Sequence, residues 1–377
     1  MADAAGRSRD EVAAYLTLAQ VPGIGSARLR TLVVAFETAT AALHAPHGAI
    51  AALPGFTRAA ASAIRAGSIR AGREILDQLD RHGAGVVLPD DAAFPPLLNE
   101  IPEPPALLYT WGDVSLLARP AAGIVGSRDH SAYGADAARL LASGVARAGV
   151  VVVSGMARGI DAVAHTAALD AGGRSIGVLG NGFGVIYPAA NRALYDRMGA
   201  GGCLITELPP GERPHAGAFP RRNRLISGVA GVTVVVEAAP GSGALITADC
   251  ALDQGRTVLA VPGPITSLTS LGCNRLIQQG AKPALTAGDI LEELGLPGAA
   301  QASRERPAAG EPGERPPPPD LSGLQRSLWE TLRTEPKHVD ALVATAGTDT
   351  GAVLTALTEL EMRGVVKQQP GMVFGLA

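Results

Sequence analysis

The sequence predicts an α/β protein: a doubly wound, Rossmann-like and mostly parallel sheet, with a small helical N-terminal domain and a C-terminal winged-helix domain. From residue 121 onward, short runs of β-branched residues alternate with helical stretches. These runs are apolar almost throughout, which is typical of strands covered by helices on both faces. The alternation of strand and helix favours parallel neighbours, because each helix returns the chain to the same end of the sheet.

Strands are expected in six segments of this central part: AAGIVGS, VVVVSG, RSIGVLG, CLITEL, VTVVVEA and RTVLAVPG. Residues 83–120 are rich in proline and are expected to form a lead-in to the sheet. The extended core is therefore predicted to cover residues 83–298.

The chain before the core, residues 1–82, is predicted to form a helical domain. The segments VPGIGSARLRTLVVAF and LPGFTRAAASAIRA each place a Pro-Gly turn ahead of a helix. This pattern resembles helix-hairpin-helix repeats, which hold nucleic-acid phosphates with backbone amides at a helix N-terminus. A second interpretation stays open, in which this domain only packs against other domains or dimerises.

The chain after the core begins with a segment rich in proline, glycine and charge, which predicts a solvated linker over residues 299–320. Residues 321–377 follow with three amphipathic stretches, LQRSLWETLRTEP, HVDALVATAG and DTGAVLTALTELEMRG, and then two short strands about a Pro-Gly turn. Three helices and a hairpin in so short a segment indicate a winged helix.

Composition excludes several classes of protein. No apolar run approaches the roughly 20 residues that a membrane span needs, and the N-terminus lacks the pattern of a secretory signal, so a cytoplasmic protein is expected. The cysteines are Cys203, Cys250 and Cys273, an odd number spread along the chain. This spacing favours reduced thiols over disulfides or a zinc site, and no metal is expected.

The loops that follow the predicted strands contain the candidate site, because ligands bind beyond the carboxyl ends of parallel strands. These loops are rich in glycine, Ser, Thr, Asn and Arg, and poor in carboxylates. Glycine loops and helix N-termini offer backbone amides to phosphate, and one arginine guanidinium can donate two parallel hydrogen bonds to phosphate oxygens. The arginines at this edge are Arg128, Arg158, Arg192, Arg221, Arg222 and Arg224. No acidic residue occurs between Glu212 and Glu237, so the arginines of FPRRNR have no local carboxylate in the sequence to neutralise them.

The motifs in these loops indicate which kind of phosphate compound they bind. The segment GNGFGV has the wrong glycine spacing for a dinucleotide fingerprint, and no P-loop sequence is present, so NAD and ATP are disfavoured. Phosphate-binding loops repeated along one edge suggest a polymer, and aromatic rings between them suit the bases of a single strand. Candidate rings are Phe183, Tyr187 and Phe219.

Other residues at this edge have simpler interpretations. Ser127 and Ser154 are either ligand contacts or turn caps, and Gly155 and Gly159 either approach a ligand or only allow a tight turn. His165 lies four residues after Asp161 on one predicted helix, a spacing that suits an acid–base pair, but packing against the next strand is favoured.

At these residues the sequence resembles a known family. The segments GIVGSR, VVSGMARGIDAVAH, IGVLGNGFGVIYPAAN, TELPPGERP, FPRRNRLISG, GSGALITADCALDQGR and LGCNRLIQQGAKP occur in one order and together resemble the DNA-processing protein A family, also called Smf. The resemblance spans roughly residues 89–294, and the flanking domains resemble those of many members.

The resemblance implies a single-stranded DNA-binding mediator of natural transformation and homologous recombination. Such a protein protects incoming strands, loads the RecA recombinase onto them, forms a homodimer through the core, and has no established catalysis and no cofactor. It implies DNA contacts by Arg128 and the arginines of FPRRNR. Together with the loop analysis, it predicts these DNA-binding residues: Gly126, Ser127, Arg128, Arg158, Gly159, Gly180, Gly182, Tyr187, Asn191, Arg192, Phe219, Arg221, Arg222, Asn223 and Arg224.

One departure and two alternatives accompany this prediction. Many relatives have a basic residue in the Y-P-x-x-N motif, where this chain has Ala189 and Ala190, so that contact is expected to shift to Arg192 or to be lost. The segment EAAPGSGALITAD loosely resembles the loop of phosphoribohydrolase-like enzymes, although Ser242, Thr247 and Asp249 do not fit its spacing.

The second alternative is a protein-interaction adaptor that binds no DNA. The predicted recognition helix of the winged helix, residues 350–363, carries Glu359 and Glu361 against one arginine. This composition disfavours duplex binding by that helix, and a protein-docking or dimer-stabilising role stays open.

Overall fold

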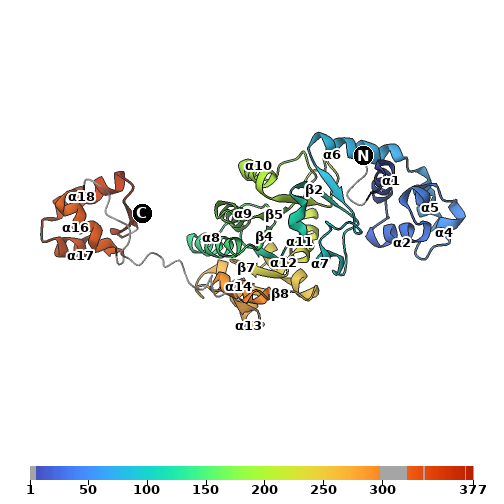
Figure 1. The fold of residues 1–377 in the computed structure, drawn as a ribbon. Coiled ribbons are helices and arrows are strands. Elements are labelled where there is room, and N and C mark those ends of the chain that lie inside the picture. Colours follow the sequence, from blue (N-terminus) through green and yellow to red (C-terminus); the bar gives the residue numbers. More distant parts are fainter. Residues whose placement is uncertain (1–5, 298–320, 334–335, 370, 377) are drawn as a thin grey trace. The chain divides into compact units, whose positions relative to one another are not determined.

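The computed structural model describes residues 6–297, 321–333, 336–369 and 371–376, and the chain divides into two compact units, Met1–Arg304 and Glu305–Ala377 (Figure 1). The linker predicted over residues 299–320 lies outside the described residues. The two units are therefore described separately.

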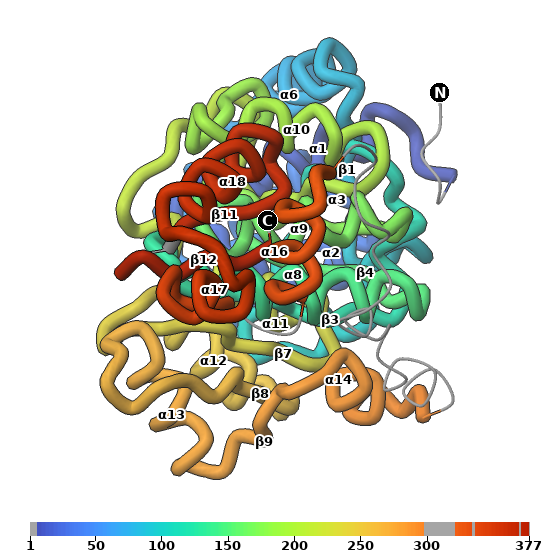
Figure 2. The backbone as a smooth tube through the Cα atoms, turned by 90° about the vertical axis from the view of Figure 1, so that its left-hand side faces the viewer, coloured from blue at the N-terminus to red at the C-terminus, as the bar shows by residue number. Residues whose placement is uncertain are grey.

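The first unit contains a sheet to which the described residues contribute nine strands. They are β1 (Gly85–Val87), β2 (Leu108–Gly112), β3 (Ala121–Val125), β4 (Val151–Ser154), β5 (Ser175–Val178), β6 (Cys203–Thr206), β7 (Val232–Val235), β8 (Thr257–Ala260) and β9 (Lys282–Pro283). Their order across the sheet is β1-β2-β6-β5-β4-β3-β7-β8-β9. In this spatial order, every neighbouring pair from β6 across to β9 is parallel. The pairs β1–β2 and β2–β6 are antiparallel. Figure 2 shows β7, β8 and β9 in succession toward one edge.

All six predicted strands are present, so the doubly wound, mostly parallel sheet is confirmed. The interpretation of residues 83–120 as a lead-in was incomplete, because β1 and β2 extend the sheet beyond β6. Tyr109 in β2 faces Thr206 of β6 in this antiparallel pairing. The prolines around these strands hide them in the sequence, and β9 is only two residues long.

Helices cover both faces of the sheet. On one face lie α8 (Ala132–Arg147), α9 (Ile160–Asp170) and α14 (Ala287–Glu293), and on the other lie α11 (Ala218–Val229), α12 (Gly243–Asp253) and α13 (Leu271–Gln278). Strand β3 shows why its sequence is apolar throughout: Ile124 packs with α8 and α9, whereas Val125 packs with α11 and α12. Burying each such side chain contributes roughly 1.5–3 kcal/mol. The first unit also contains α7 (Pro96–Asn99), α10 (Arg192–Gly201), which packs beside α9, and the 3-10 helices η1 (Val114–Ala118), η2 (Ala189–Asn191) and η3 (Leu268–Ser270).

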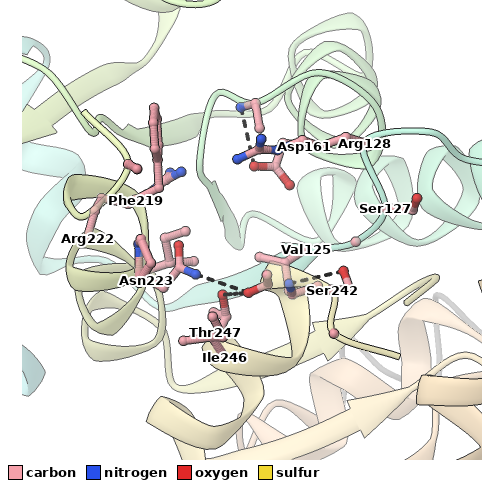
Figure 3. A pocket seen from close by; sticks show the side chains of 18 of the residues that line it. Val125, Ser127, Arg128, Asp161, Phe219, Arg222, Asn223, Ser242, Ile246 and Thr247 are labelled. Atoms are coloured by element: carbon pink, nitrogen blue, oxygen red, sulfur yellow. Dashed lines mark hydrogen bonds between the residues drawn. The ribbon is translucent and has the colours of Figure 1, made fainter. Parts of the chain in front are cut away.

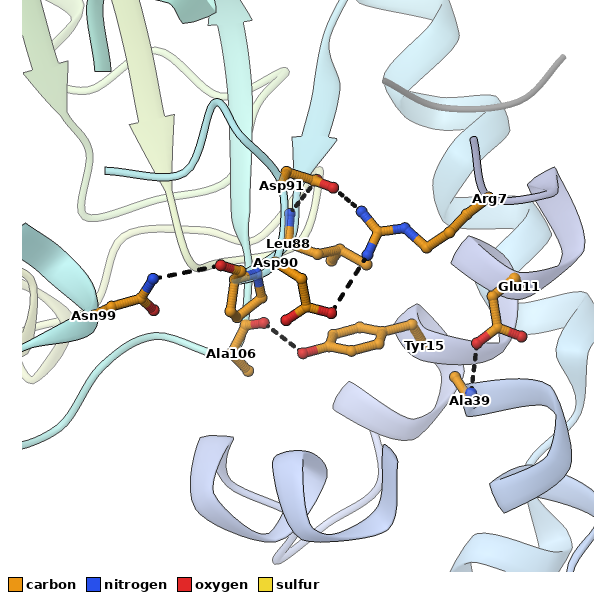
Figure 4. Close-up of polar contacts among 10 residues, drawn as sticks. Arg7, Glu11, Tyr15, Ala39, Leu88, Asp90, Asp91, Asn99 and Ala106 are labelled. Carbon is orange, nitrogen blue, oxygen red and sulfur yellow. Dashed lines mark hydrogen bonds and ion pairs between the residues drawn. The ribbon is translucent and has the colours of Figure 1, made fainter. Parts of the chain in front are cut away.

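The N-terminal segment forms α1 (Arg9–Ala19), α2 (Ser26–Phe36), α3 (Ala39–His44), α4 (His47–Ala51), α5 (Arg58–Ala66) and α6 (Ile69–Arg81). The two helices predicted after Pro-Gly turns are α2 and α5, and Gly23 and Gly55 adopt φ of +79° in those turns. These helices pack on the core: the Tyr15 hydroxyl donates to the Ala106 carbonyl at 2.8 Å, and Arg7 pairs with Asp91 (Figure 4). The helical segment is thus part of the first compact unit.

The second unit contains α16 (Gly323–Leu332), α17 (Val339–Ala346) and α18 (Thr350–Met362), with β10 (Lys337–His338), β11 (Val366–Gln369) and β12 (Val373–Leu376). The antiparallel strand order is β10-β12-β11. Leu328, Trp329, Leu357 and Phe374 belong to its own buried core. The predicted three helices and hairpin are present, and β10 adds a third strand that the sequence pattern did not predict.

Candidate nucleic-acid interface

A cleft of about 800 Å³ lies beyond the carboxyl ends of β3 and β7. From β3 the chain adds β4, β5 and β6 on one side, and then returns to add β7 and β8 on the other. The loops after β3 and β7 therefore lead in opposite directions, and such a reversal point is where open α/β sheets bind their ligands. Side chains from the loop after β3 and from the first turns of α11 and α12 line the cleft (Figure 3).

The loop after β3 packs tightly against the loop before α9. The Ile160 N–H donates to the Ser127 carbonyl at 3.1 Å. Gly159, immediately before it, has φ of +81°, and a Cβ there would overlap the backbone oxygens of Ser127 and Arg128. Gly159 is therefore required for the close approach of two loops, and it does not itself line the cleft. Ser127 acts as a turn cap, since its Oγ accepts from the Asp129 N–H at 3.1 Å.

Arg128, Phe219 and Tyr187 form a ladder along one wall of the cleft. The Arg128 guanidinium lies 5.6 Å from the centroid of the Phe219 ring, and the Phe219 and Tyr187 rings lie 5.5 Å apart with 38° between their planes. Arg128 is exposed and makes no ion pair with the residues that the structure describes, and Tyr187 is 43% exposed. Such a ladder offers a cation to phosphate and ring faces to bases.

Phe183, the third candidate ring, is buried in the hydrophobic core together with Leu179 and Tyr195. Its position beside glycines in the sequence suggested an exposed loop. The structure shows that it packs beneath that loop, so this candidate was wrong.

Arg222 lies at the base of the ladder and is buried, with only 6% of its surface exposed. Its Nη1 donates to the Val178 carbonyl at 2.6 Å, and a Cβ on Gly155 would overlap its guanidinium. Burial lowers the pKa of Arg222 to about 10, with the Asp161 carboxylate acting in the opposite direction, so the side chain stays cationic at neutral pH.

Asp161 is a buried acidic residue whose charge interacts with that of Arg222. Its Oδ2 accepts from the backbone N–H groups of Gly155 at 3.1 Å and Ala157 at 3.3 Å. Burial raises the pKa of Asp161, and the Arg222 charge opposes that rise. Asp161 ties the loop after β4 to α9, and Arg222 ties α11 to the end of β5, so the two residues shape the wall on which a ligand would rest.

The three arginines of FPRRNR point to different places. Arg222 faces the cleft, Arg224 forms an ion pair with Glu207 at 2.6 Å, and Arg221 is exposed on a separate groove. No carboxylate is local to these arginines in the sequence, but the fold supplies Glu207 to Arg224 and brings the charge of Asp161 to act on Arg222. Both carboxylates are distant in sequence from α11.

Asparagines and glycines of the predicted set hold the loops in place. Asn191 Nδ2 donates to the carbonyls of Met156 and Ala157 at 2.9 and 3.1 Å, and Asn223 Nδ2 donates to the Gly243 carbonyl at 3.0 Å. A Cβ on Gly180 would overlap the Phe219 ring. These residues therefore position the cleft walls.

The predicted residues thus fall into three groups. Those that line the cleft are Gly126, Ser127, Arg128, Tyr187, Phe219, Arg222 and Asn223. Arg158 and Gly180 line a smaller adjoining pocket of about 110 Å³. Those outside both are Gly159, Gly182, Asn191, Arg192, Arg221 and Arg224. Arg158 and Arg192 are exposed and without ion pairs among the described residues.

Sequence reasoning selected no residue from the first turn of α12, although it forms the opposite wall. Ser242 caps this helix by accepting from the Ala244 N–H at 3.3 Å, and Ile246 and Thr247 line the cleft behind it. The sequence did contain a sign of this wall, because the segment directly follows the predicted strand VTVVV and ligands bind beyond the ends of such strands. The order of strands, which places it beside the loop of Arg128, could not be read from the pattern.

Two buried ionisable groups near the site have structural roles. Ser175 Oγ donates to the Val152 carbonyl, and it accepts from His165 Nδ1 at 2.7 Å. Burial, aided by the charge of Arg222, lowers the pKa of His165 to about 3, so the imidazole is neutral. Glu237 accepts from the Ser131 N–H and hydroxyl and from the Thr269 hydroxyl at 2.6–3.0 Å. The packing interpretation of His165 therefore agrees with its surroundings.

Two further findings concern the described residues as a whole. Among them, no three His, Cys, Asp or Glu side chains gather in a way that could hold a metal ion. Within the same residues, no helix is both long and apolar enough to cross a membrane.

Comparison with known proteins gives concordant matches. The family model for DNA recombination-mediator protein A matches residues 85–295, and that for the DprA winged helix domain matches residues 312–372. Protein Smf of Synechocystis sp. is 34% identical over 97% of this chain and 98% of its own length.

Solved structures agree with these matches. DNA processing protein A from Streptococcus pneumoniae superposes with a TM-score of 0.61 at 33% identity, covering 76% of this chain and 98% of its own. DNA processing protein A from Helicobacter pylori, described for its single-stranded DNA binding mode, gives a TM-score of 0.51 at 26% identity, covering 56% and 95%. With one family model matching more than half of the chain and a relative matching nearly all of it, this protein belongs to the DNA recombination-mediator protein A family, also known as DprA or Smf.

Proposed function

We propose that this protein binds single-stranded DNA along the cleft beyond β3 and β7 and delivers it to the RecA recombinase, in natural transformation or homologous recombination. It acts in the cytoplasm, as a homodimer and without catalysis. The observation that carries this proposal is the ladder of Arg128, Phe219 and Tyr187, in which an unpaired cation lies next to two ring faces. The single-stranded DNA binding described for the Helicobacter pylori relative supports it.

In this mechanism Arg128 and Arg158 bind phosphates, because both are exposed at the cleft or its adjoining pocket and neither is neutralised by a described carboxylate. Tyr187 and Phe219 stack against bases. Arg222 and Asp161 keep the loops beneath the strand in position.

The same arrangement favours single strands over duplexes. Stacking on Tyr187 requires a base whose face is free, and in a duplex both faces of each base are covered by its neighbours. Binding through phosphates and ring faces is largely independent of sequence, which suits a protein that must accept any incoming strand.

Support for RecA delivery comes from membership of a recombination-mediator family. For the homodimer, the edge beyond β8 offers exposed apolar side chains: Ile265 is 85% exposed and Leu268 is 71% exposed, and Ile265 and Leu271 line one surface depression.

No observation favours the phosphoribohydrolase-like alternative. Such chemistry needs a carboxylate free to assist the departure of a base from ribose. Asp161 is the acidic side chain in the cleft lining, and it is engaged by two backbone amides and Arg222. Asp249 is exposed on α12 and does not line the cleft.

The test is fluorescence anisotropy with a labelled single-stranded oligonucleotide and its duplex across a salt series. We expect the wild type to prefer the single strand, and Arg128→Ala to weaken binding and to reduce the slope of log affinity against log salt by about 0.7, the value for one phosphate contact on a single strand. Arg147→Ala is the matched control, because Arg147 is an exposed arginine in the last turn of α8, away from the cleft. Equal affinity for duplex and single strand, or no effect of Arg128→Ala, would overturn the mechanism.

A further inference from the structure

A second groove, of about 740 Å³, lies between the helical segment and the core. It is lined by the end of α1 and the start of α2, by residues of the segment 101–107, by Tyr109 of β2 and Glu207 after β6, and by the first turns of α11. Its lining shares no residue with the cleft beyond β3 and β7. We name it the hairpin groove, after the helical hairpin of α1 and α2, whose residues Gln20, Ile24 and Gly25 line one wall.

The two walls of the hairpin groove are fixed to each other. The Tyr15 hydroxyl of α1 donates to the carbonyl of Ala106, which belongs to the opposite wall (Figure 4). Arg7, just before α1, pairs with Asp91 of the segment that follows β1. The groove is thus a built feature of the first compact unit.

The lining of the hairpin groove is rich in hydrogen-bond donors that lack acceptors. Arg30 and Arg221 make no ion pair with any residue in the described part of the chain. Arg224 bonds Glu207 through Nη2 alone, and its Nε and Nη1 are buried without partners. Glu103 is the one other carboxylate in the lining, so positive charge is in excess.

A buried hydroxyl adds to this excess. Tyr109, at the floor of the groove, is fully buried, and its hydroxyl meets no acceptor at hydrogen-bonding geometry. Burial raises the pKa of Tyr109, with the nearby Gln20 side chain acting in the opposite direction, so the hydroxyl keeps its proton and remains a donor. Unsatisfied buried donors are costly, and a ligand rich in acceptors would relieve that cost.

The N-terminus of α2 opens onto the same groove. Gly25, Ser26 and Ala27 line it, and the N-cap Gly25 supplies no side chain to the first backbone amides. In the second Pro-Gly turn, by contrast, Thr57 caps α5 by accepting from the Ala60 N–H at 3.1 Å. The free amides of α2 add to the donors of the groove and favour an anion.

We propose that the hairpin groove binds phosphates of the same DNA strand that occupies the cleft beyond β3 and β7. This inference rests on the proposed function. Helix α11 connects the two sites, because Arg222 faces the cleft and its neighbour Arg221 faces the groove. A strand that leaves the Phe219 end of the cleft therefore passes the start of α11 and enters the groove, where Arg30 and Arg221 hold its phosphates.

The test compares a short strand with a long one. The short oligonucleotide has about 5 nucleotides and the long one about 16, near the two ends of the range of site sizes for single-strand binding. We expect Arg30→Ala to leave the affinity for the short strand unchanged, and to weaken the long strand by about threefold, as for one exposed charge contact. The salt slope for the long strand should fall by about 0.7.

Arg58→Ala is the matched control, because Arg58 is the exposed first residue of α5, after the second Pro-Gly turn, and lines neither site. Arg221→Ala is a second variant, whose exposed side chain can be removed without disturbing the fold. An unchanged affinity and salt slope for the long strand in both variants would overturn the inference. If Arg128→Ala still weakens the short strand, the proposed function survives that result, whereas a wild type that binds neither strand removes both proposals.

Discussion

At the scale of single residues, Arg222 and Arg128 are expected to have different roles. Arg222 is buried and structural, whereas Arg128 is exposed and is proposed to bind the ligand. Removing Arg222 removes a buried side chain that donates to the Val178 carbonyl and whose positive charge acts on the buried Asp161. Removing one of two interacting buried charges typically costs about 3–5 kcal/mol. We therefore predict that Arg222→Ala lowers the free energy of unfolding by about that amount, whereas Arg128→Ala, which removes an exposed side chain, leaves it nearly unchanged.

Urea denaturation of both variants measures this difference. A second measurement uses Arg222→Ala combined with Asp161→Asn. The second substitution removes the negative charge of Asp161 and should recover part of the lost stability. Equal stability of Arg222→Ala and the wild type would mean that Arg222 is not a structural residue, and its loss of DNA binding would then report a direct contact.

The sequence predicted the residues of the cleft better than their roles. Glycine loops after apolar strands identified Gly126, Ser127 and Arg128, because parallel strands place such loops at one edge. The direction of each arginine in FPRRNR could not be predicted, since neighbours on a helix point about 100° apart. The carboxylates that meet Arg222 and Arg224 come from α9 and from the loop after β6.

At the scale of elements, periodicity predicted the strands that are covered on both faces and missed those at the edges. Strands β3 to β8 are apolar runs because both of their faces are buried. Strands β1 and β2 lie near prolines and pair in antiparallel fashion, so they lack the alternation with helices on which the prediction depended. The hairpin groove depends on this missed segment, because residues 101–107 precede β2 and form one of its walls.

Glu237 connects three elements at the edge of the cleft, and it offers a prediction at this scale. Its carboxylate accepts from Ser131, the N-cap of α8, and from Thr269 of η3. We predict that Glu237→Gln, which replaces one acceptor oxygen with a donor, lowers the free energy of unfolding by about 1–3 kcal/mol. Thermal unfolding measures the loss.

The control for this prediction is Asp249→Asn, which makes the same kind of change at an exposed carboxylate of α12. An equal effect of the two substitutions would show that Glu237 does not hold the three elements together.

At the scale of the whole molecule, attraction to DNA cannot come from net charge, because the formal net charge is −3. It has to come from where the cations lie. Arg128 in the cleft and Arg30 and Arg221 in the hairpin groove make no ion pair with described residues, whereas other arginines are neutralised, as Arg9 is by Asp77 and Asp80. A short interaction range follows, since exposed charges are screened beyond roughly 8–10 Å at physiological salt.

The last prediction concerns the proposed homodimer. If the exposed Ile265 and Leu268 form its interface, placing charges there separates the subunits, because a buried carboxylate without a partner is costly. We predict that Ile265→Glu with Leu268→Glu halves the mass measured by light scattering. Leu140→Glu, at an exposed leucine of α8, is the control and should leave the mass unchanged.

Two linked clefts bind one long strand with raised effective concentration, so the monomeric variant should lose affinity for a long strand on the order of a hundredfold and keep its affinity for a short one. An unchanged mass would place the interface elsewhere, and a halved mass with unchanged long-strand affinity would show that each subunit binds its strand alone.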